Sequence, residues 1–422
     1  MFSGCENIKR FNLNNFDTSE VLDMSYLFKD CKNAEDINIT SFKTSKVEDM
    51  YSMFVGCESL TSLYLLNFNT SQVEDMSRMF SNCKKLQNLN LENFNSKKVF
   101  DMSYMFANCL ELLDIKGINN FDISQVTDMS NMFYKCQNLT SLDLYSFNTN
   151  KVTNMSSMFS GCEALTSLKM NRFYTSLVED FHSMFQDCSN LESLDLSSFD
   201  TSKISDMSNM FSNCKSLISL YIPSFDTRNV IDMNNMFSNC QKLNNLKNYF
   251  DTRKVKNMSN MFYNCYSLSS IDVSSFITDN VIDMSSMFSN CLNLTYLYIP
   301  FFETSKVKNM SNLFKNCQSL ISIDISSFIT DNVIDMSNMF YNCESLTSLD
   351  LSSFNTENVQ NMNYMLYSCP SLKYIDISSF TSSLDEIDLS DFQAEIGSLK
   401  IKQMFYNLLK IRPNDNWTLY FN

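Results

Sequence analysis

One residue type, cysteine, recurs at a nearly constant interval and constrains the fold more than any other feature of this sequence. The 15 cysteines run from Cys5 to Cys369, and successive cysteines lie 26 residues apart except for one gap of 27 after Cys109 and one of 25 after Cys240. Self-similarity at a fixed period of about 20 to 50 residues is the signature of a repeat protein. Such a chain buries its apolar residues between neighbouring repeats, because a single repeat has no core of its own.

Each repeat contains one segment with the alternation typical of a short strand. Leu191, Leu194 and Leu196 show it, and the same spacing returns at Leu60, Leu63 and Leu65 and at Leu346, Leu349 and Leu351. Strands repeated at a fixed interval stack in parallel, each coil covering the last. The sequence therefore predicts an α/β solenoid with one short parallel strand per repeat.

A second segment of the repeat has helical spacing. In one copy, Met207, Met210, Phe211 and Cys214 stand at positions i, i+3, i+4 and i+7, which is the pattern of the inward face of a helix. We expect a short helical turn in every repeat.

The residue before the first Met of this segment has a short side-chain oxygen in fourteen repeats. A calcium-binding or catalytic row would need carboxylates, whereas an N-cap or Asx-turn needs only a hydrogen-bond acceptor. The interchange of Asp and Asn favours the cap or turn. The position is Asp in ten repeats and Asn in four: Asp23, Asp49, Asp75, Asp101, Asp128, Asp180, Asp206, Asp232, Asp283, Asp335, Asn154, Asn257, Asn309 and Asn361.

Two aromatic positions and the cysteine position complete the predicted core. The first is Phe in every copy from Phe16 to Phe380, and the second is Phe in every copy except Leu366, so both should stack along the solenoid. The cysteines share one inward position, which favours a row of buried free thiols over the irregular spacing of a disulfide framework. No two cysteines are close enough in sequence for a local zinc knuckle.

Composition argues against several functional classes. The five glycines are too dispersed for a phosphate-binding loop or a nucleophile elbow, and His182 is the only histidine. We therefore expect no catalytic residue, no cofactor and no metal site. The formal net charge is −15, so the chain lacks the basic face with which a protein binds nucleic acid. We also expect no transmembrane segment, since no run of 18 apolar residues occurs, and we find no signal peptide in residues 1–30.

The repeats resemble the 26-residue leucine-rich repeats of BspA-like bacterial surface proteins over about residues 1–384. The motifs that carry this resemblance lie at Leu346 to Phe354 and at Thr278 to Cys291. The resemblance implies a leucine-rich-repeat solenoid with a concave parallel sheet, here a right-handed stack of about 15 coils. It also implies a non-enzymatic protein that is secreted or on the cell surface and that mediates adhesion or binding.

Specificity in such a solenoid resides in the outward positions that flank the central apolar residue of each strand. These are mostly Ser, Asp and Asn, with scattered tyrosines, and one pair is Asn245 and Lys247. Tyrosine combines rigid contact area with a hydroxyl, which suits a protein or glycan ligand. We expect Tyr221, Tyr296 and Tyr298 to form the main contact patch; the alternative is a sheet surface without a ligand. The candidate partner-binding residues are Tyr64, Tyr221, Tyr296, Tyr298 and Tyr374.

The repeat pattern stops near residue 384. Residues 385–422 are predicted to form a C-terminal cap that shields the last coil. Its amphipathic helix would span residues 390–411, with Leu399 and Phe405 on the apolar stripe, and the segment beginning at Trp417 would add a final strand.

Two functions remain open for a chain of this kind. One is a monomeric binding or adhesion protein outside the cell, and the other is an intracellular scaffold for protein–protein interaction with the same fold. Buried free thiols suit either compartment, so the cysteine row does not separate the two.

Overall fold

The computed structural model describes residues 1–223, 225–244, 246, 250–299, 301–381, 397–401 and 417–421. The chain divides into two compact units. The first comprises Met1–Ile204 and Asn213–Ser224, and the second comprises Ser205–Ser212 and Phe225–Asn422. Each unit is described here by itself.

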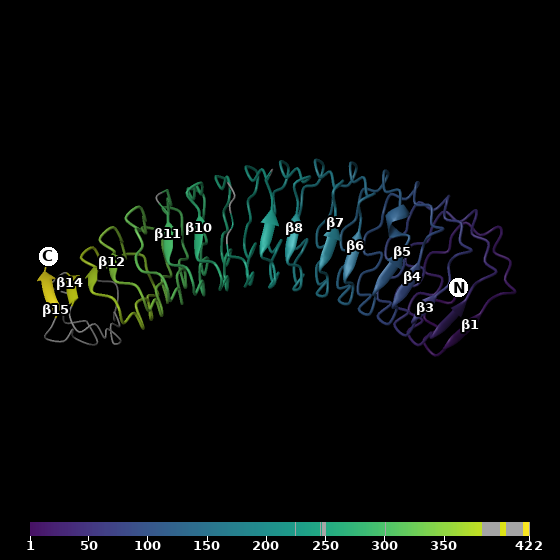
Figure 1. The fold of residues 1–422 in the computed structure, drawn as a ribbon, viewed down its shortest axis with the longest axis horizontal. Coiled ribbons are helices and arrows are strands. Elements are labelled where there is room, and N and C mark those ends of the chain that lie inside the picture. Colours follow the sequence, from purple (N-terminus) through teal and green to yellow (C-terminus); the bar gives the residue numbers. More distant parts are fainter. Residues whose placement is uncertain are drawn as a thin grey trace. The chain divides into compact units, whose positions relative to one another are not determined.

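The first unit is a parallel β-solenoid whose short strands, one per coil, pair with strands of neighbouring coils in small sheets of two or three strands (Figure 1). The register advances by one repeat, so that Phe11 pairs with Ile37 and Leu89 with Ile115. Its elements are β1 (Arg10–Asn12), β2 (Asp36–Asn38), β3 (Ser62–Leu63), β4 (Asn88–Asn90), β5 (Asp114–Lys116), the 3-10 helix η1 (Ile118–Asn120), β6 (Ser141–Asp143), β7 (Ser167–Lys169), β8 (Ser193–Asp195) and β9 (Ser219–Tyr221).

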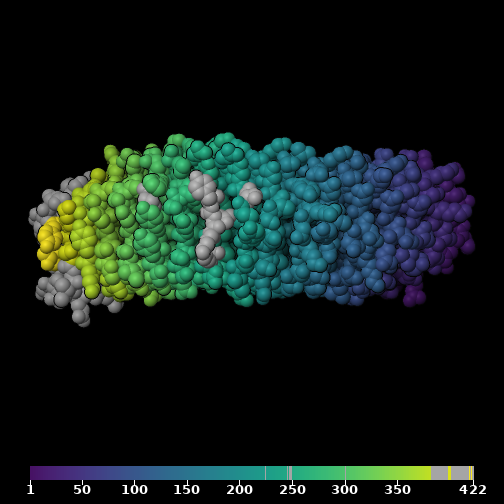
Figure 2. Space-filling model, turned by 45° about the horizontal axis from the view of Figure 1, so that its top comes forward, coloured from purple at the N-terminus to yellow at the C-terminus, as the bar shows by residue number. Residues whose placement is uncertain are grey.

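The second unit has the same architecture. Its strands are also parallel, and Ile271 pairs with Leu297 and Leu349 with Ile375. In the space-filling view, the coils of each unit follow one another as bands in chain order (Figure 2). The elements are β10 (Ser270–Asp272), β11 (Tyr296–Tyr298), β12 (Ser348–Asp350), β13 (Tyr374–Asp376), β14 (Gly397–Ile401) and β15 (Trp417–Phe421).

The predicted helical turn in each repeat is wrong. Among the described residues the only helical segment is η1. Around Met76 the backbone N–H groups alternate instead: those of Met76 and Phe80 donate to the next coil, whereas that of Met79 donates to the carbonyl three residues back, at Met76. This pattern is a series of tight turns with a second parallel ladder running between coils.

Left-handed residues explain why turns replace a helix. Arg78 has φ 56° and Asn82 has φ 60°, and the same two positions have positive φ in nearly every other coil. Turns with a positive φ at their third residue favour Gly or Asn there, whereas a right-handed helix excludes such residues. The second position is Gly or Asn in most coils, including Gly56, Asn82 and Gly161.

The Asx-turn predicted for the Asp/Asn row is confirmed, although no helix follows it to be capped. In all fourteen coils the side-chain Oδ1 accepts the backbone N–H two residues on. The distance is 2.7 Å from Ser77 to Asp75 and 3.1 Å from Ser156 to Asn154. Since Asn makes the same bond as Asp, the position needs an acceptor and not a charge.

The predicted aromatic stacks are confirmed in both units. Phe80 lies between Phe54 and Phe106 with ring centroids 5.7 Å away on each side. The other aromatic position stacks at a wider spacing, for example 6.3 Å between Phe302 and Phe276. These rings are buried with the methionines and leucines of the same coils, so each coil covers the apolar surface of its neighbour.

A buried threonine links neighbouring coils beside the Phe row. The Thr70 hydroxyl donates to the carbonyl of Asn95 at 3.0 Å and accepts the N–H of the same residue at 2.7 Å. One side chain thus satisfies both backbone groups of a residue in the next coil, as buried polar groups require. The threonine is not present in every coil, since the corresponding position of another coil is Ile123.

All 15 cysteines are free, and all are buried except the half-buried Cys5. The predicted row of buried thiols is therefore present, with one thiol per coil. Burial raises the pKa of Cys109 and Cys265 to about 12, because a thiolate there would lose its hydration.

The C-terminal segment contains strands that continue the second unit. β14 pairs with β13, with Leu399 opposite Ile375, and β15 pairs with β14. The helix predicted over residues 390–411 is wrong at β14, where Leu399 is a buried strand residue, and the remainder of that span lies outside the described residues. The predicted final strand corresponds to β15. Its capping role stays a prediction.

Candidate functional site: the outward face of the strands

The strands expose the residues on either side of a buried centre. In β11 the central Leu297 is buried, whereas Tyr296 is 58% exposed and Tyr298 is 53% exposed. Because side chains alternate along a strand, both tyrosines project from the same outward face. The structure thus brings together two of the sequence-predicted site residues on one strand.

Small and acidic residues flank the two tyrosines in the adjacent coils. In β10, Ser270 pairs with Tyr296 and Asp272 with Tyr298. On the other side, a hollow of about 340 Å³ is lined by both tyrosines together with Ser322 and Asp324 of the next coil. Because serines stand beside Tyr296, no bulky neighbour covers its ring.

The two flanking carboxylates are fixed and ionised. Asp272 Oδ1 accepts the backbone N–H of Ser274 at 3.0 Å and its hydroxyl at 2.6 Å, and Asp324 makes the same bonds to Ser326 at 3.0 and 2.7 Å. These hydrogen bonds lower the pKa of both carboxyl groups, and the bond from the serine side chain has the larger effect. Each Asp therefore carries its charge at neutral pH on a rigid side chain.

A third exposed aromatic residue, Phe301, follows β11 and was missed by the sequence analysis. It is 64% exposed. Most other coils have Ser or Asn at this position, for example Ser275 and Ser327. The replacement of this small residue by Phe was the signal in the sequence. We call Tyr296, Tyr298 and Phe301 the aromatic coil.

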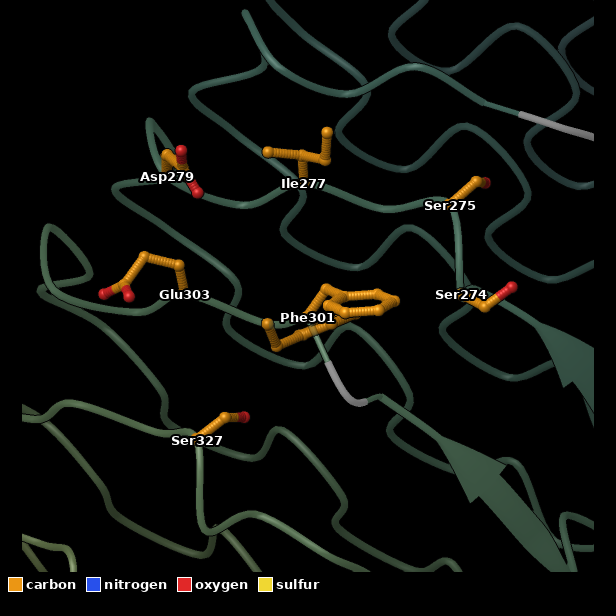
Figure 3. Close-up of a pocket in the computed structure, with 8 residues that line it drawn as sticks. Ser274, Ser275, Ile277, Asp279, Phe301, Glu303 and Ser327 are labelled. Atoms are coloured by element: carbon orange, nitrogen blue, oxygen red, sulfur yellow. The ribbon is translucent and has the colours of Figure 1, made fainter.

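Phe301 lines a second hollow, of about 520 Å³, beside the first. In Figure 3 its ring lies across the middle of this hollow, with the Asp279 and Glu303 carboxylates at one end and Ser274 and Ser275 at the other. Ser327 lines both hollows, so they adjoin one another.

The remaining predicted site residues are distributed over both units. Tyr64 follows β3 and is 55% exposed, and Tyr221 in β9 is 57% exposed, both in the first unit. Tyr374 in β13 of the second unit is 36% exposed. The grouping of Tyr221 with Tyr296 and Tyr298 spans the two units and stays a prediction. The outward pair Asn245 and Lys247 lies outside the described residues.

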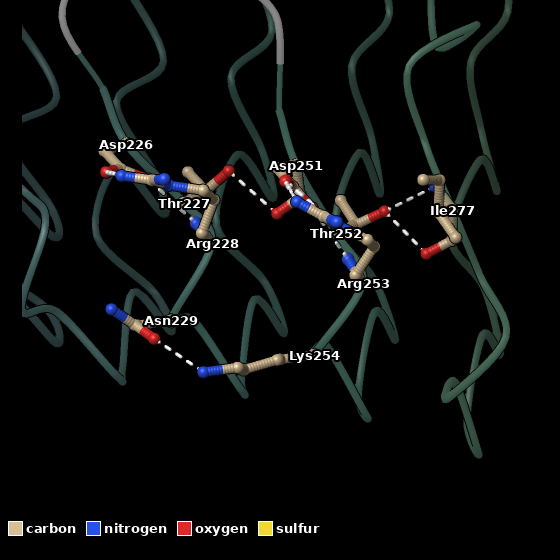
Figure 4. A network of polar contacts seen from close by, with 9 residues as sticks. All are labelled: Asp226, Thr227, Arg228, Asn229, Asp251, Thr252, Arg253, Lys254 and Ile277. Atoms are coloured by element: carbon tan, nitrogen blue, oxygen red, sulfur yellow. Dashed lines mark hydrogen bonds and ion pairs between the residues drawn. The ribbon is translucent and has the colours of Figure 1, made fainter.

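Elsewhere on the surface, some acidic side chains form ion pairs within the chain. Lys169 lies in register with Asp143 and pairs with its carboxylate at 3.1 Å, and Lys400 pairs with Asp376 at 2.9 Å. At an edge of the second unit, Arg228 and Arg253 clasp Asp226 and Asp251 through two nitrogens each (Figure 4). These arginines are committed to neighbouring carboxylates.

His182 occupies a routine position of the repeat. Its Nδ1 lies 2.7 Å from Oδ2 of Asp180, in the same Asx-turn that the other coils build. Within the described part of the chain, no group of three or more His, Cys, Asp and Glu side chains is arranged to hold a metal ion. A search of the same residues finds no helix with the length and hydropathy that a membrane span requires.

Several solved structures to which this chain is similar are bacterial leucine-rich-repeat proteins. One from Bacteroides ovatus is 19% identical, with a TM-score of 0.49, over 88% of this chain and 86% of that one. A leucine-rich cell surface protein from Faecalibacterium prausnitzii is 18% identical, with a TM-score of 0.34, over 74% and 84%. The functional domain of InlJ from Listeria monocytogenes, described as including a cysteine ladder, is 14% identical with a TM-score of 0.24 over 98% and 73%. Similarity at this level identifies no ligand and no cellular location.

A family model matches the chain from end to end in four overlapping segments, residues 1–115, 110–217, 189–296 and 295–417. Among curated proteins, no sequence matches significantly. None of the descriptions cited here names an enzyme. The chain belongs to the family DUF285, described as Mycoplasma protein of unknown function.

Proposed function

We propose that this chain is a non-enzymatic binding or adhesion protein, secreted or on the cell surface, that recognises a protein or glycan through the outward face of its strands. The observation that carries the proposal is the aromatic coil. Three large aromatic side chains, each more than half exposed, stand where neighbouring coils have mainly small or acidic residues.

Exposed aromatic side chains are unfavourable unless something covers them. Burial of one such ring stabilises a complex by about 1.5 to 3 kcal/mol, and tyrosine and phenylalanine lose little conformational entropy on contact. The two adjoining hollows let a ligand contact the faces of the rings and not only their edges. Tyr64, Tyr221 and Tyr374 provide further contact positions for an extended ligand.

The experiment probes immobilised extracellular proteins and glycans with the purified chain. We expect saturable binding to at least one of them, with loss of that binding in the variant Tyr296→Ser, Tyr298→Ser, Phe301→Ser. The matched control replaces three exposed tyrosines elsewhere, Tyr145, Tyr174 and Tyr364, by Ser. Binding that the two variants weaken equally, or no saturable binding at all, would contradict the proposal.

A second candidate is an intracellular interaction scaffold. The 15 free cysteines are compatible with it, since reduced thiols are typical of the cytosol, but buried free thiols also suit a protein outside the cell. Antibody labelling of intact and permeabilised cells separates the two candidates. Labelling of intact cells supports the surface location, and labelling only after permeabilisation supports the scaffold.

A further inference from the structure

We infer that the aromatic coil binds a basic segment of a partner protein, with a Lys or Arg side chain seated in each of its two hollows. This inference rests on the proposed function and specifies the chemistry of the partner.

The sheet around β11 carries negative charge and no positive charge. Its outward positions in three successive coils are Ser270 and Asp272, then Tyr296 and Tyr298, then Ser322 and Asp324. Tyr298 therefore stands between two ionised carboxylates. A cation placed over its ring gains from the electrons of the ring and from both charges.

Two other coils show that an Asp at this position can bind a lysine of the neighbouring coil. In β6 and β7, Asp143 is in register with Lys169, and the ammonium group lies 3.1 Å from the carboxylate. Asp272 has Tyr298 in the place of that lysine. Among the described residues, neither Asp272 nor Asp324 takes part in an ion pair, and only Oδ1 of each accepts a hydrogen bond. An incoming Lys or Arg supplies the missing cation.

The second hollow repeats this chemistry with different residues. Phe301 forms its aromatic wall, and the carboxylates of Asp279 and Glu303 lie at one end (Figure 3). In the first unit an arginine already lies above an aromatic ring, since the Arg172 guanidinium lies 4.9 Å from the ring centroid of Tyr145. The aromatic side chain and the acids of the second hollow therefore suit a second basic side chain.

The pairing of aromatic rings with carboxylates favours a basic protein segment over a neutral glycan. A glycan gains from the rings and from hydrogen bonds, but it leaves the negative charges of the two hollows without counter-charges. The chain as a whole carries a net charge of −15, which attracts a basic partner and repels an acidic one. Because the two hollows adjoin, we expect the partner to carry two basic residues close together.

The test uses synthetic Gly/Ser peptides with two arginines at spacings of two to six residues, and matched peptides with neutral citrulline in place of arginine. Binding to the full chain is measured by fluorescence anisotropy at physiological salt. The diagnostic variant is Asp272→Asn, Asp324→Asn, which removes charge but keeps the Asx-turn. Asn38 and Asn90 already make this turn at the same position in other coils.

We expect arginine peptides to bind and citrulline peptides not to bind, and we expect the diagnostic variant to weaken binding about 10-fold or more. The variant Asp279→Asn, Glu303→Gln should have a similar effect through the second hollow. The charge-matched control is Asp36→Asn, Asp114→Asn, at exposed positions of the first unit, and it should change affinity by less than about 3-fold because neither residue lines either hollow and salt screens surface charges outside the contact.

Three results overturn the inference. The first is equal losses in the diagnostic and control variants, which would mean non-specific charge attraction, and the second is equal binding of arginine and citrulline peptides. A third is absence of peptide binding while a glycan binds in a manner that requires Tyr296 and Tyr298; the proposed function would then stand without this partner class. If neither peptides, proteins nor glycans bind through these residues, the proposed function fails as well.

Discussion

The thiol of Cys83 donates a hydrogen bond to the backbone carbonyl of Phe54 in the preceding coil, with 3.2 Å between Sγ and the oxygen. The same carbonyl accepts the backbone N–H of Cys57 at 3.1 Å. All fourteen buried cysteines make the corresponding thiol bond. Each buried cysteine therefore acts as a small apolar residue that also donates a hydrogen bond, and it does so as a free thiol.

The fourteen buried thiols should be unreactive in the native protein, and stability should fall at alkaline pH. Thiol reagents at about pH 8 should modify Cys5 quickly and the buried cysteines only on unfolding, because the thiolate is the reactive form. Burial raises the pKa of Cys109 from 9.0 to about 12, so between these values the unfolded chain binds fewer protons than the folded one. The free energy of unfolding therefore decreases as pH rises through this range.

The measurement for the thiols is urea unfolding at pH 7.5 and pH 10, with Cys109→Ala as the control for other titrating groups. The variant should lose less stability between the two pH values than the wild type. Rapid modification of most thiols in the native protein would contradict the burial of the row.

Replacement of Thr70 by Val should destabilise the first unit. The Thr70 hydroxyl satisfies both the N–H and the carbonyl of Asn95, so Val removes two partly buried hydrogen bonds. The expected loss in urea unfolding is about 1 to 3 kcal/mol. Thr70→Ser keeps both bonds and should retain most of the stability; equal losses in the two variants would show that the methyl group, and not the hydroxyl, matters.

Replacement of Asp101 by Asn should stabilise the protein at neutral pH. Burial, together with the carboxylates of Asp75 and Asp128, raises the pKa of Asp101 above 3.8. A raised folded-state pKa means that the ionised carboxylate costs stability once the pH exceeds that pKa. Asn keeps the Asx-turn, as Asn154 shows, so Asp101→Asn should gain less than about 1 kcal/mol at this partly exposed position.

The gain from Asp101→Asn should disappear near pH 3, where the carboxyl group is protonated in both the folded and the unfolded chain. Thermal unfolding of both proteins at pH 3 and pH 7 measures the difference. A loss of stability at pH 7 would mean that the carboxylate forms a favourable contact that Asn cannot replace.

Asn82 should tolerate Gly but not Val. Its φ of 60° is in the left-handed region, where a β-branched side chain is strained. Asn82→Gly should change the free energy of unfolding by less than about 0.5 kcal/mol, whereas Asn82→Val should lower it by about 1 to 2 kcal/mol. Similar stabilities for the two variants would show that the turn adopts another conformation in solution.

These turns mark the limit of what the sequence predicted. The coil length, the parallel strands, the stacked Phe rows, the buried thiols and the Asx-turns all follow from residues that recur in one position. The spacing of Met207, Met210 and Phe211 suggested a helix because turns closed over three residues also place apolar side chains three and four positions apart. The informative residues were Asn209 and Asn213, whose spacing of four marks the two left-handed positions.

The candidate site was predicted in part. Tyr296 and Tyr298 follow from strand alternation, because residues beside a buried centre face outward. Phe301 was missed because it lies after the strand, outside the outward positions that flank the central residue of each strand. Its exposure and its shared hollow with Asp279 and Glu303 depend on the packing of neighbouring coils. No local sequence pattern contains that information.

Hydrogen–deuterium exchange of the full chain, with and without a saturating bound partner, tests the central claim most directly. We predict that protection on binding is concentrated at β11 and the turn through Phe301 and Glu303, with smaller effects in the adjoining coils at Asp272 and Asp324. The Asp/Asn row, which lies on a different part of each coil, should be unchanged. Protection confined to that row, or to the first unit, would contradict the assignment of the aromatic coil as the binding site.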